Sequence, residues 1–558
     1  MWPPARMPQS PIRYDGVLAR SLPQLARLGI ASPPPPSARI WVHGPSGRMP
    51  LPLSMRPPMK VEAASSRLLH GPAPGCRRHR APDAARGSGN PARLFPDPVH
   101  LRGMDFDSVV VGAGSAGFAA ARTMAAAGQR VAVVDGARQL GGLCILRGCM
   151  PTKALLHAAE LRHAIEAARP WGIETGSVRI DMKALLARKD AFVADFASYR
   201  RQQLETGPFR LLRGQARFVG PTTRHVEGQG DVTALNFVLA TGSVMAPPPL
   251  PSLDEVGCLT SDTALGLDVV PGSMVVLGGG PVAMEFAQYF ARLGARVTVL
   301  QRGDRLLSGM DPDLGEELAR ALEREGLSIL TGTRLLGFES HGPAKRVRFL
   351  HHGVERFLDA DELFNGLGRR PATAGLGLEH VGVRVRPSGH VECDATQRTS
   401  APHVYAAGDC CGPLEVVHVA IHQAEVAARN ILAGTGMEQV DARCRLVGVF
   451  TDPGVAVAGL GERAARDAGR TVRVASHPFN DHGKSMIRGC RDGFVKLVAD
   501  AATGELLGGA CVGPDACELI HEVVVALAAR MTASQLARVP HYHPTLSEIW
   551  TYPAEELG

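Results

Sequence analysis

The chain of 558 residues lacks several features that mark particular protein classes. No stretch approaches the roughly 20 consecutive apolar residues that span a bilayer, so no transmembrane helix and no membrane partner are predicted. The 11 cysteines are odd in number and too widely spaced for the disulfide framework of a small secreted protein. We therefore expect a cytoplasmic protein of several domains, in which a paired cysteine motif would serve redox catalysis.

Excess charge is also absent from most of the chain. The formal net charge is +7, but residues 1–103 hold 15 Lys and Arg against 4 Asp and Glu, and the rest of the chain holds 46 against 50. That larger part offers no electrostatic reason to bind nucleic acid, so no nucleic-acid partner is expected.

Residues 1–103 lack the apolar periodicity of a helix or a strand. They hold 20 of the 42 prolines, including Pro33–Pro36, and bury too little apolar surface to offset their ordering entropy. We predict a disordered Pro/Arg-rich extension that is an over-extended reading frame, with Met104 as the natural start. The alternative is a targeting peptide, because arginine is abundant and acids are few, although frequent proline would break an amphipathic helix.

A glycine-rich turn follows the first buried strand of the remaining chain. The segment reads as strand, turn, helix and strand at residues 109–111, 112–117, 118–127 and 130–134. Gly112, Gly114 and Gly117 allow a tight turn and let a pyrophosphate approach the backbone at the helix N-terminus. Asp135 ends the second strand, where a carboxylate accepts hydrogen bonds from a ribose diol. The pattern predicts a dinucleotide site.

A second unit of the same kind begins at Met274. Its strand, helix and second strand are expected at residues 274–277, 284–293 and 296–300. Gly278, Gly280 and Ala283 occupy its turn, and Gln301 ends the second strand. Both units place 23 positions between the first glycine and the residue that ends the second strand. One such motif also occurs in ordinary strand-to-helix turns, but two in matching context predict two dinucleotide sites.

The end of the second unit bears on the choice of nicotinamide nucleotide. An acid at position 301 would bond the 2′-hydroxyl of NAD and repel the 2′-phosphate of NADP. The chain has Gln301 and Arg302 there, a neutral donor and a guanidinium that suit the 2′-phosphate. NADPH is therefore expected, with NADH as the alternative if Arg302 is only a solvated surface charge.

Two cysteines follow the first unit in the segment GGLCILRGCMPTK. Cys144 and Cys149 are five positions apart, and Gly148 gives the backbone the freedom to close a small ring. Pro151 suits the first turn of a helix, so Cys149 would lie at a helix N-terminus, where the dipole favours a thiolate. The placement predicts a redox-active pair, and the alternative is two buried structural cysteines.

Together these motifs resemble the pyridine nucleotide-disulfide oxidoreductase family, which includes lipoamide dehydrogenase, glutathione reductase and mercuric reductase. The resemblance runs from about Phe106 to the C-terminus. Further segments that resemble family motifs are Ala240–Ser243, Gly366–Pro371, Val404–Asp409, Thr451–Pro453 at the opening of a dimerisation domain, and His541–Glu548. The resemblance implies FAD in the first site, NADPH or NADH in the second, and a homodimer.

The resemblance also implies roles for single residues. Cys149 would be the charge-transfer thiol that faces the flavin, and Cys144 the interchange thiol that meets the substrate. Lys153 would lie near the flavin and pair with Glu285, with two ordinary exposed charges as the alternative. The other cofactor-binding positions that it implies are Gly112, Gly114, Gly117, Asp135, Gly214, Ala216, Thr241, Gly242, Ser243, Asp409, Gly278, Gly280, Ala283, Gln301, Arg302 and Gly368. No metal ligand is expected.

A histidine near the C-terminus is the expected acid–base. The resemblance implies that His543 reaches Cys144 of the partner subunit and that Glu548 orients the imidazole. An imidazole titrates near neutrality, so it can take a thiol proton and return it. Thr545 and Glu548 also fit a helix capping box, which would make Glu548 structural instead.

The chain departs from the family pattern in several places. Asp135 stands where the family commonly has Glu, and Pro281 replaces an aromatic gate, so nicotinamide access is expected to be ungated. Gly454 replaces a frequent Glu of the interface segment. The C-terminus lacks the cysteine pair with which mercuric reductases hand over the metal. Cys410 and Cys411 are interpreted as core packing, with a second redox pair as the alternative.

We predict an α/β protein with two doubly wound, Rossmann-like dinucleotide-binding domains and a C-terminal α+β dimerisation domain, whose sheet includes 494–498 and 506–512. The expected limits are 1–103 for the extension, 104–251 and 376–436 for the FAD-binding domain, 252–375 for the NAD(P)-binding domain and 437–558 for the interface domain. The favoured activity is that of a dihydrolipoyl dehydrogenase acting on a lipoyl-type or other small disulfide or thiol. The alternatives are an NADPH-dependent reductase of another small disulfide or metal ion, and a non-catalytic flavoprotein subunit of a larger complex.

Overall fold

The structure, a computed structural model, describes residues 103–435, 437–441, 443 and 445–558. The predicted extension lies outside the described residues, apart from Gly103. None of the helices in the described ranges combines the length and the apolar character that a membrane crossing requires.

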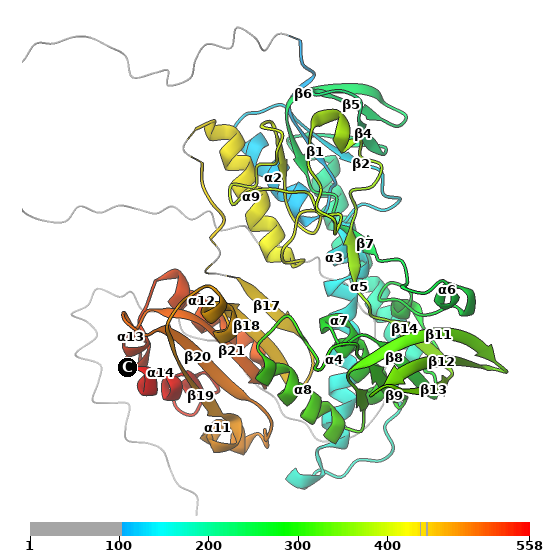
Figure 1. Cartoon of the computed structure of the whole chain (residues 1–558), viewed down its shortest axis with the longest axis vertical. Coiled ribbons are helices and arrows are strands. Elements are labelled where there is room, and N and C mark those ends of the chain that lie inside the picture. The colour runs from blue at the N-terminus through cyan, green and yellow to red at the C-terminus, as the bar shows by residue number, and fades with distance from the viewer. Residues whose placement is uncertain (1–102, 436, 442, 444) are drawn as a thin grey trace, which may run out of the picture. The chain divides into compact units, whose positions relative to one another are not determined.

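The first α/β unit is built on a seven-stranded sheet in the order β3-β2-β1-β6-β5-β4, with β16 beside β6. Its strands are β1 Phe106–Val111, β2 Val131–Asp135, β3 Arg210–Arg213, β4 Ala216–Phe218, β5 Thr223–Val226, β6 Gly230–Leu239 and β16 Val404–Ala406. Helices α2 (Ser115–Ala126) and α9 (Val417–Ala433) lie side by side and share a core with one face of this sheet (Figure 1). Because β16 joins β6 in parallel, the chain leaves this unit and returns to it.

The second α/β unit has a parallel sheet in the order β10-β9-β8-β14. Its elements are β8 Ser273–Leu277, α7 Pro281–Leu293, β9 Arg296–Leu300, α8 Pro312–Arg324, β10 Ser328–Leu330 and β14 Glu362–Asn365. An antiparallel three-stranded meander follows β10 (Figure 1), made of β11 Thr333–His341, β12 Ala344–His351 and β13 Val354–Ala360. The two connections to the first unit pair with each other as β7 (Ser243–Met245) and β15 (Arg369–Pro371).

Both predicted helices begin earlier than the sequence pattern indicated. Helix α2 starts at Ser115 rather than at 118, because it begins directly from the glycine turn that follows β1. Helix α7 starts at Pro281 rather than at 284, and proline suits the first turn because its missing N–H would have no intrahelical partner there. In both units the helix N-terminus therefore lies at the glycine turn itself.

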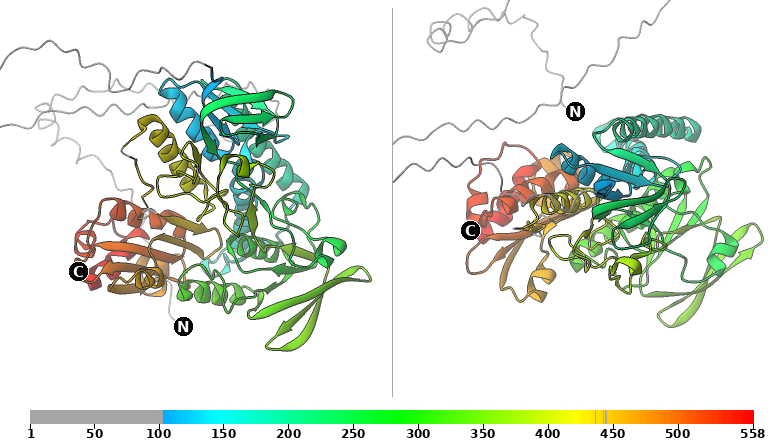
Figure 2. Two further views of the ribbon diagram at one scale, coloured as in Figure 1. Left: turned by 45° about the horizontal axis from the view of Figure 1, so that its top comes forward. Right: turned by 90° about the horizontal axis from the view of Figure 1, so that it is seen from above.

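The C-terminal unit has a five-stranded antiparallel sheet in the order β17-β18-β21-β20-β19. Its elements are β17 Leu446–Val449, β18 Gly454–Gly459, α10 Glu462–Asp467, β19 Val472–Pro478, α11 Gly483–Ile487, β20 Phe494–Asp500, β21 Leu506–Gly513, α12 Ala516–Ala528, α13 Ala533–Ala537 and α14 Thr551–Leu557. Helices α12, α13 and α14, orange to red in Figure 2, share one core with this sheet. The predicted strands 494–498 and 506–512 are confirmed, and the sheet begins before Thr451, with β17.

Three helices connect the two cysteines with the rest of the fold: α3 Gly142–Arg147, α4 Cys149–Glu166 and α5 Met182–Glu205. A shorter helix, α6 (Ser252–Val256), packs against β11. The second α/β unit and the C-terminal unit are joined by ion pairs of the buried Lys496. Lys496 Nζ lies 2.9 Å from Asp311 Oδ2 and 2.7 Å from Asp313 Oδ2. The architecture agrees with the predicted fold class, whereas the domain limits stay a prediction.

Candidate active site

The first glycine turn has no room for side chains where the backbone must close. A Cβ on Gly112, whose φ is +103°, would lie 2.3 Å from the carbonyl oxygen of Ala240, and a Cβ on Gly117 would lie 1.8 Å from that of Gly112. A Cβ on Gly114 would instead meet only Gly142 Cα, at 3.9 Å. The turn is therefore closed on the protein side and open at Gly114, the shape that a pyrophosphate needs at a helix N-terminus.

Asp135 is held at this turn by the backbone. Its Oδ2 accepts the N–H of Ala113 at 2.8 Å, and its Oδ1 accepts the N–H of Ala137 at 2.7 Å. The N–H of Gly214 binds the Asp135 carbonyl at 3.2 Å, whereas Ala216 is buried in the core of the sheet. The carboxylate keeps free lone pairs for a ribose diol, so the residues present fit the adenosine end of FAD.

The second glycine turn repeats this geometry. Gly278 also has a φ of +103°, and a Cβ there would lie 2.6 Å from the carbonyl oxygen of Gly366. A Cβ on Gly280 would meet nothing within 4 Å, so this position is open in the same way as Gly114. Ala283 Cβ lies 2.7 Å from the ideal Cβ position of Gly366, which explains a small residue at the third place. The equal spacing of the two motifs thus corresponds to equal backbone conformation.

Cys144 and Cys149 lie at the junction of α3 and α4, and both are free thiols. A Cβ on Gly148 would lie 3.1 Å from Cys144 Cα, so glycine lets the two cysteine-bearing turns approach each other. A Cβ on Gly142, at the start of α3, would lie 2.8 Å from Gly114 Cα. The start of α3, the helix that carries Cys144, therefore packs directly against Gly114 at one side of the first glycine turn. Cys149 is exposed and Cys144 is partly exposed, so the alternative of two buried structural cysteines is wrong.

The two thiols differ in acidity. The hydrogen bond from Cys144 lowers the pKa of Cys149 to about 6, with help from the positive charge of Lys153 and against the effect of burial. The same hydrogen bond, together with burial, raises the pKa of Cys144 well above its usual range. At neutral pH the pair therefore shares one proton, which Cys144 holds, while Cys149 is the thiolate.

Lys153, one turn after Cys149 on α4, forms the predicted pair with Glu285 of α7. Its Nζ lies 3.0 Å and 2.8 Å from the two carboxylate oxygens and 4.3 Å from the ring centroid of Phe450. Glu285 is 3% exposed, so the alternative of an ordinary surface charge is wrong, and it also accepts the N–H of Phe450 at 3.0 Å. These contacts fix the ammonium beside Cys149.

Replacing Lys153 by methionine is expected to make the Cys149 thiolate harder to form. The thiolate is present above its pKa and is lost as the pH falls through it. Without the ammonium, and with the buried Glu285 charge uncompensated, the pKa rises and the midpoint moves to higher pH. At pH 6 the thiolate fraction should fall about fivefold. The rate of alkylation by iodoacetamide, followed against pH in the dithiol form, measures this.

Lys153→Arg is the matched control, because it keeps the positive charge on α4. It should hold the alkylation midpoint near that of the unmodified chain. An unchanged midpoint in Lys153→Met would show that the lysine does not act on the thiol.

The predicted segment Ala240–Ser243 lies against the first glycine turn. Thr241 Cα is 3.3 Å from the ideal Cβ position of Gly112. Gly242 and Gly368 have φ values of +70° and +112°, which the close pairing of β7 with β15 requires.

Ser243 connects this pairing with Asp409. Its Oγ donates to Asp409 Oδ2 at 2.7 Å and accepts from Arg369 Nε at 2.9 Å. Asp409 is thereby oriented from the β7 side. The sequence motif named Asp409, but it did not predict that Arg369 would bind Ser243 and so fix the residue that donates to Asp409.

The acid–base candidate lies on the C-terminal unit, at the beginning of the last helical turns. His543 Nδ1 lies 2.9 Å from Glu548 Oε2, and the imidazole is 78% exposed. Thr545 Oγ1 contacts Ser547 Oγ and caps no backbone N–H of the described residues, among which the helical turn Ser547–Trp550 begins without a side-chain cap. The capping-box alternative for Glu548 is therefore wrong, because its carboxylate binds the histidine.

Residues 106–424 match the family model of the pyridine nucleotide-disulphide oxidoreductases, and residues 447–554 match the model of their dimerisation domain. The chain belongs to this family. The pyridine nucleotide-disulphide oxidoreductases use FAD and NAD(P)H, and the two glycine turns described above fit these two nucleotides.

Several relatives cover nearly the same part of the chain. The dihydrolipoyl dehydrogenase of Thermus scotoductus is 38% identical over 458 residues, which are 81% of this chain and 97% of the relative. The mercuric reductase of Bacillus cereus is 32% identical over 80% of this chain and 70% of the relative. LpdA from Mycobacterium tuberculosis shares the fold with a TM-score of 0.73 at 27% identity, over 81% of this chain and 99% of that chain.

A further solved structure is that of the HOCl-induced flavoprotein disulfide reductase RclA from Escherichia coli, described as a Cu(II) complex. It matches with a TM-score of 0.71 at 27% identity, over 81% of this chain and 99% of that chain. Dihydrolipoyl dehydrogenases, a mercuric reductase and a disulfide reductase thus share this architecture.

The end of β9 carries Gln301 and Arg302, both of which were expected to bind the 2′-phosphate of NADP, but their surroundings differ. Gln301 Nε2 donates to the carbonyl oxygen of Arg305 at 3.1 Å, so one of its two amide N–H groups is used within its own loop. Arg302 is exposed and forms no ion pair with any residue in the described ranges. The guanidinium and the second amide N–H of Gln301 are therefore the donors available to a phosphate, and the preference for NADPH stays a prediction.

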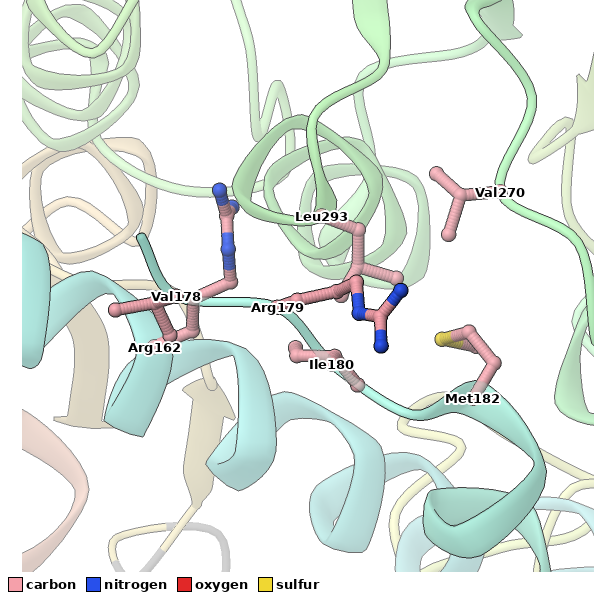
Figure 3. A pocket seen from close by; sticks show the side chains of 7 residues that line it. All are labelled: Arg162, Val178, Arg179, Ile180, Met182, Val270 and Leu293. Carbon is pink, nitrogen blue, oxygen red and sulfur yellow. The ribbon is translucent and has the colours of Figure 1, made fainter. Parts of the chain in front are cut away.

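Other features of the oxidoreductase lie apart from these groups. Cys410 and Cys411 are buried and donate to the carbonyl oxygens of Leu239 at 3.3 Å and Gly408 at 3.2 Å, so the interpretation as core packing is confirmed. Across the described ranges, no group of three or more His, Cys, Asp and Glu is placed to hold a metal ion. Figure 3 shows a cavity of about 240 Å³ lined by residues of α4, α5, α7 and the segments before α5 and β8, none of them a predicted site residue: Arg162, Val178, Arg179, Ile180, Met182, Val270 and Leu293.

Proposed function

We propose that this oxidoreductase exchanges electrons between NAD(P)H and a small dithiol or disulfide of the lipoyl type, through FAD and the Cys144–Cys149 pair. The observation that carries the proposal is the coupled pair itself. The acidities favour a thiolate at Cys149 and a protonated thiol at Cys144, and the helix that carries Cys144 packs against the first glycine turn. This asymmetry supports the proposal that Cys149 faces the flavin and that Cys144 meets the substrate.

The thiol chemistry follows from these acidities. In the oxidised pair, a substrate thiolate attacks Cys144 Sγ, and Cys149 leaves as a thiolate because its pKa is low. The second substrate thiol then loses its proton and attacks the substrate sulfur of the mixed disulfide, which releases the Cys144 thiol and the oxidised substrate. Two electrons now reside on the enzyme dithiol, and FAD supplies the two-electron link from this dithiol to the nicotinamide. The reverse sequence reduces a disulfide.

We assign the proton transfers to His543 of a second copy of the chain. Glu548 is an acceptor, so the Nδ1 that faces it carries the proton and Nε2 of the neutral ring is free to act as base. In the described ranges Nε2 makes no hydrogen bond, and the ring is exposed. The dimerisation domain supports a homodimer in which this ring serves the Cys144 of the partner subunit.

A second candidate is an NADPH-dependent reductase of another small disulfide or of a metal ion. The observation that favours it is the strand end of β9, which carries Gln301 and Arg302 and no acid. Mercuric reductases among the relatives are consistent with it.

Steady-state kinetics of the full chain with lipoamide and dihydrolipoamide, using NADH and NADPH in parallel, separate these functions. We expect lipoamide turnover with at least one nucleotide. Turnover with NADH would establish lipoyl-type activity. NADPH oxidation without lipoamide turnover would favour the second candidate, and no electron uptake beyond the flavin in an anaerobic titration would favour a non-catalytic subunit.

Arg302→Ala tests the nucleotide assignment in the same assay. If the guanidinium binds the 2′-phosphate, the KM for NADPH should rise about tenfold, the size of one charge-assisted contact, while the KM for NADH stays within about twofold. Arg305→Ala is the control from the same loop. Equal effects on both nucleotides would assign Arg302 to the surface.

A further inference from the structure

A buried histidine lies directly behind the proposed acid–base pair. His482 precedes α11 and its side chain is 0% exposed. Its Nε2 lies 3.3 Å from Glu548 Oε1, while the other carboxylate oxygen of Glu548 lies 2.9 Å from His543 Nδ1. Glu548 thus sits between two imidazoles, one fully buried and one exposed.

The other side of His482 is also fixed. Its Nδ1 lies 2.7 Å from the hydroxyl of Ser485, which is itself buried. The hydroxyl can donate to Nδ1, and this leaves the ring proton on Nε2, opposite the carboxylate. This neutral tautomer turns an N–H toward Glu548, so the ring and the carboxylate attract each other at 3.3 Å, although Nε2 lacks the geometry of a hydrogen bond.

We propose that His482 is a positioning residue, which holds Glu548 from the protein interior and thereby fixes the orientation and tautomer of His543. The inference rests on the acid–base role proposed for His543. Without His482, one oxygen of Glu548 would lose its interior partner, and the carboxylate could turn away from Nδ1 of the histidine.

The surroundings keep His482 neutral. Burial lowers the pKa of His482, and the nearby histidines His477 and His543 act in the same direction, against the charge of Glu548. Tyr552 also faces the ring, edge-on at a centroid distance of 6.1 Å, and stacks on His477 at 4.1 Å. A neutral ring that donates one N–H suits positioning, whereas a second cation here would oppose the imidazolium that forms on His543.

A double-mutant cycle separates positioning from a general structural role. His482→Met removes the N–H that faces Glu548 and should lower kcat/KM for the disulfide substrate about tenfold, because the carboxylate loses its buried polar contact. In the Glu548→Gln background, the same substitution should cost less than about twofold, because its only route to His543 is gone. Reduction of FAD by NAD(P)H should be unchanged in every variant.

A pH profile and a rescue variant accompany the cycle. The pH profile of kcat/KM should have the same midpoint in His482→Met as in Glu548→Gln. In both variants His543 loses its contact with the Glu548 carboxylate. His482→Gln keeps an N–H donor and should restore most of the activity. If His482→Met does not fold, Ser485→Ala provides the same cycle, since it removes the group that fixes the tautomer of His482.

The outcomes distinguish this inference from the proposed function. A full loss in His482→Met that persists in the Glu548→Gln background, or an unchanged kcat/KM in a folded His482→Met, would overturn the positioning role alone. If Glu548→Gln itself leaves disulfide turnover and its pH profile unchanged, the proposed acid–base pair fails first. An aromatic disulfide serves as the probe if lipoamide is not turned over.

Discussion

Replacing Cys144 by serine is expected to abolish disulfide turnover, by about 1,000-fold or more, while NAD(P)H still reduces the flavin at a rate within about twofold of normal. Serine lacks the nucleophilic sulfur that forms the mixed disulfide, but it leaves α3, the glycine turn and the nucleotide sites intact. Stopped-flow reduction by the nicotinamide, measured beside steady-state turnover, separates the two halves of the reaction.

The same variant distinguishes the two cysteines by absorbance. Cys149 stays a free thiolate in Cys144→Ser, so a charge-transfer absorbance against FAD should be present without any reductant and should be lost as the pH falls through the pKa of this thiol. Cys149→Ser should lack the absorbance at every pH. Cys490→Ser, a partly exposed thiol of the C-terminal unit, is the control and should match the unmodified chain. Substantial disulfide turnover in Cys144→Ser would contradict the assignment.

Much of this site could be predicted because its motifs are local. A glycine turn is determined by backbone sterics over a few residues. The conformation at Gly112 and Gly278 could therefore be predicted from the sequence, and both have the positive φ that the motif requires. The cysteine pair is equally local, since Gly148 and the first turn of α4 together place both sulfurs. The fold class followed from repeating these units and from the resemblance.

The parts that escaped prediction depend on contacts between distant segments. The backbone N–H of Phe450 donates to Glu285 from 165 positions away. Arg369 donates to the Ser243 hydroxyl from 126 positions away. His482 lies in a loop without a recognisable motif, 66 positions before Glu548, and only the tertiary fold brings the two side chains together. Glu548 itself was ambiguous, because a capping box and a catalytic dyad share the same spacing. Tertiary structure decides between them by showing which donor the carboxylate meets.

The acid–base assignment has a consequence for assembly. In a single chain, the described partners of Cys144 are Cys149 and Arg200, whereas His543 pairs with Glu548 on the C-terminal unit. Neither group meets the other within the described ranges of one chain, although the proposed mechanism needs them in hydrogen-bond reach. A two-fold symmetric dimer resolves this, because each subunit then lends its histidine to the cysteine pair of the other.

Co-expression of two inactive variants tests this directly. Cys144→Ser and His543→Gln homodimers should each be nearly inactive, with His543→Gln reduced about 100- to 10,000-fold. Random pairing of the two chains makes half of the dimers heterodimers, and each heterodimer has one site with an intact cysteine pair and an intact histidine. Turnover should therefore return to about a quarter of the normal value per site.

The heterodimer result discriminates because a histidine acting within its own chain predicts the opposite outcome. In that case every site of the mixture would lack either Cys144 or His543, and co-expression would restore nothing. Mixing the separately purified homodimers is the control for simple addition of residual activities. Recovery of about one quarter only after subunit exchange would place the proton and the sulfur on different chains, and would make dimerisation a requirement for the chemistry itself.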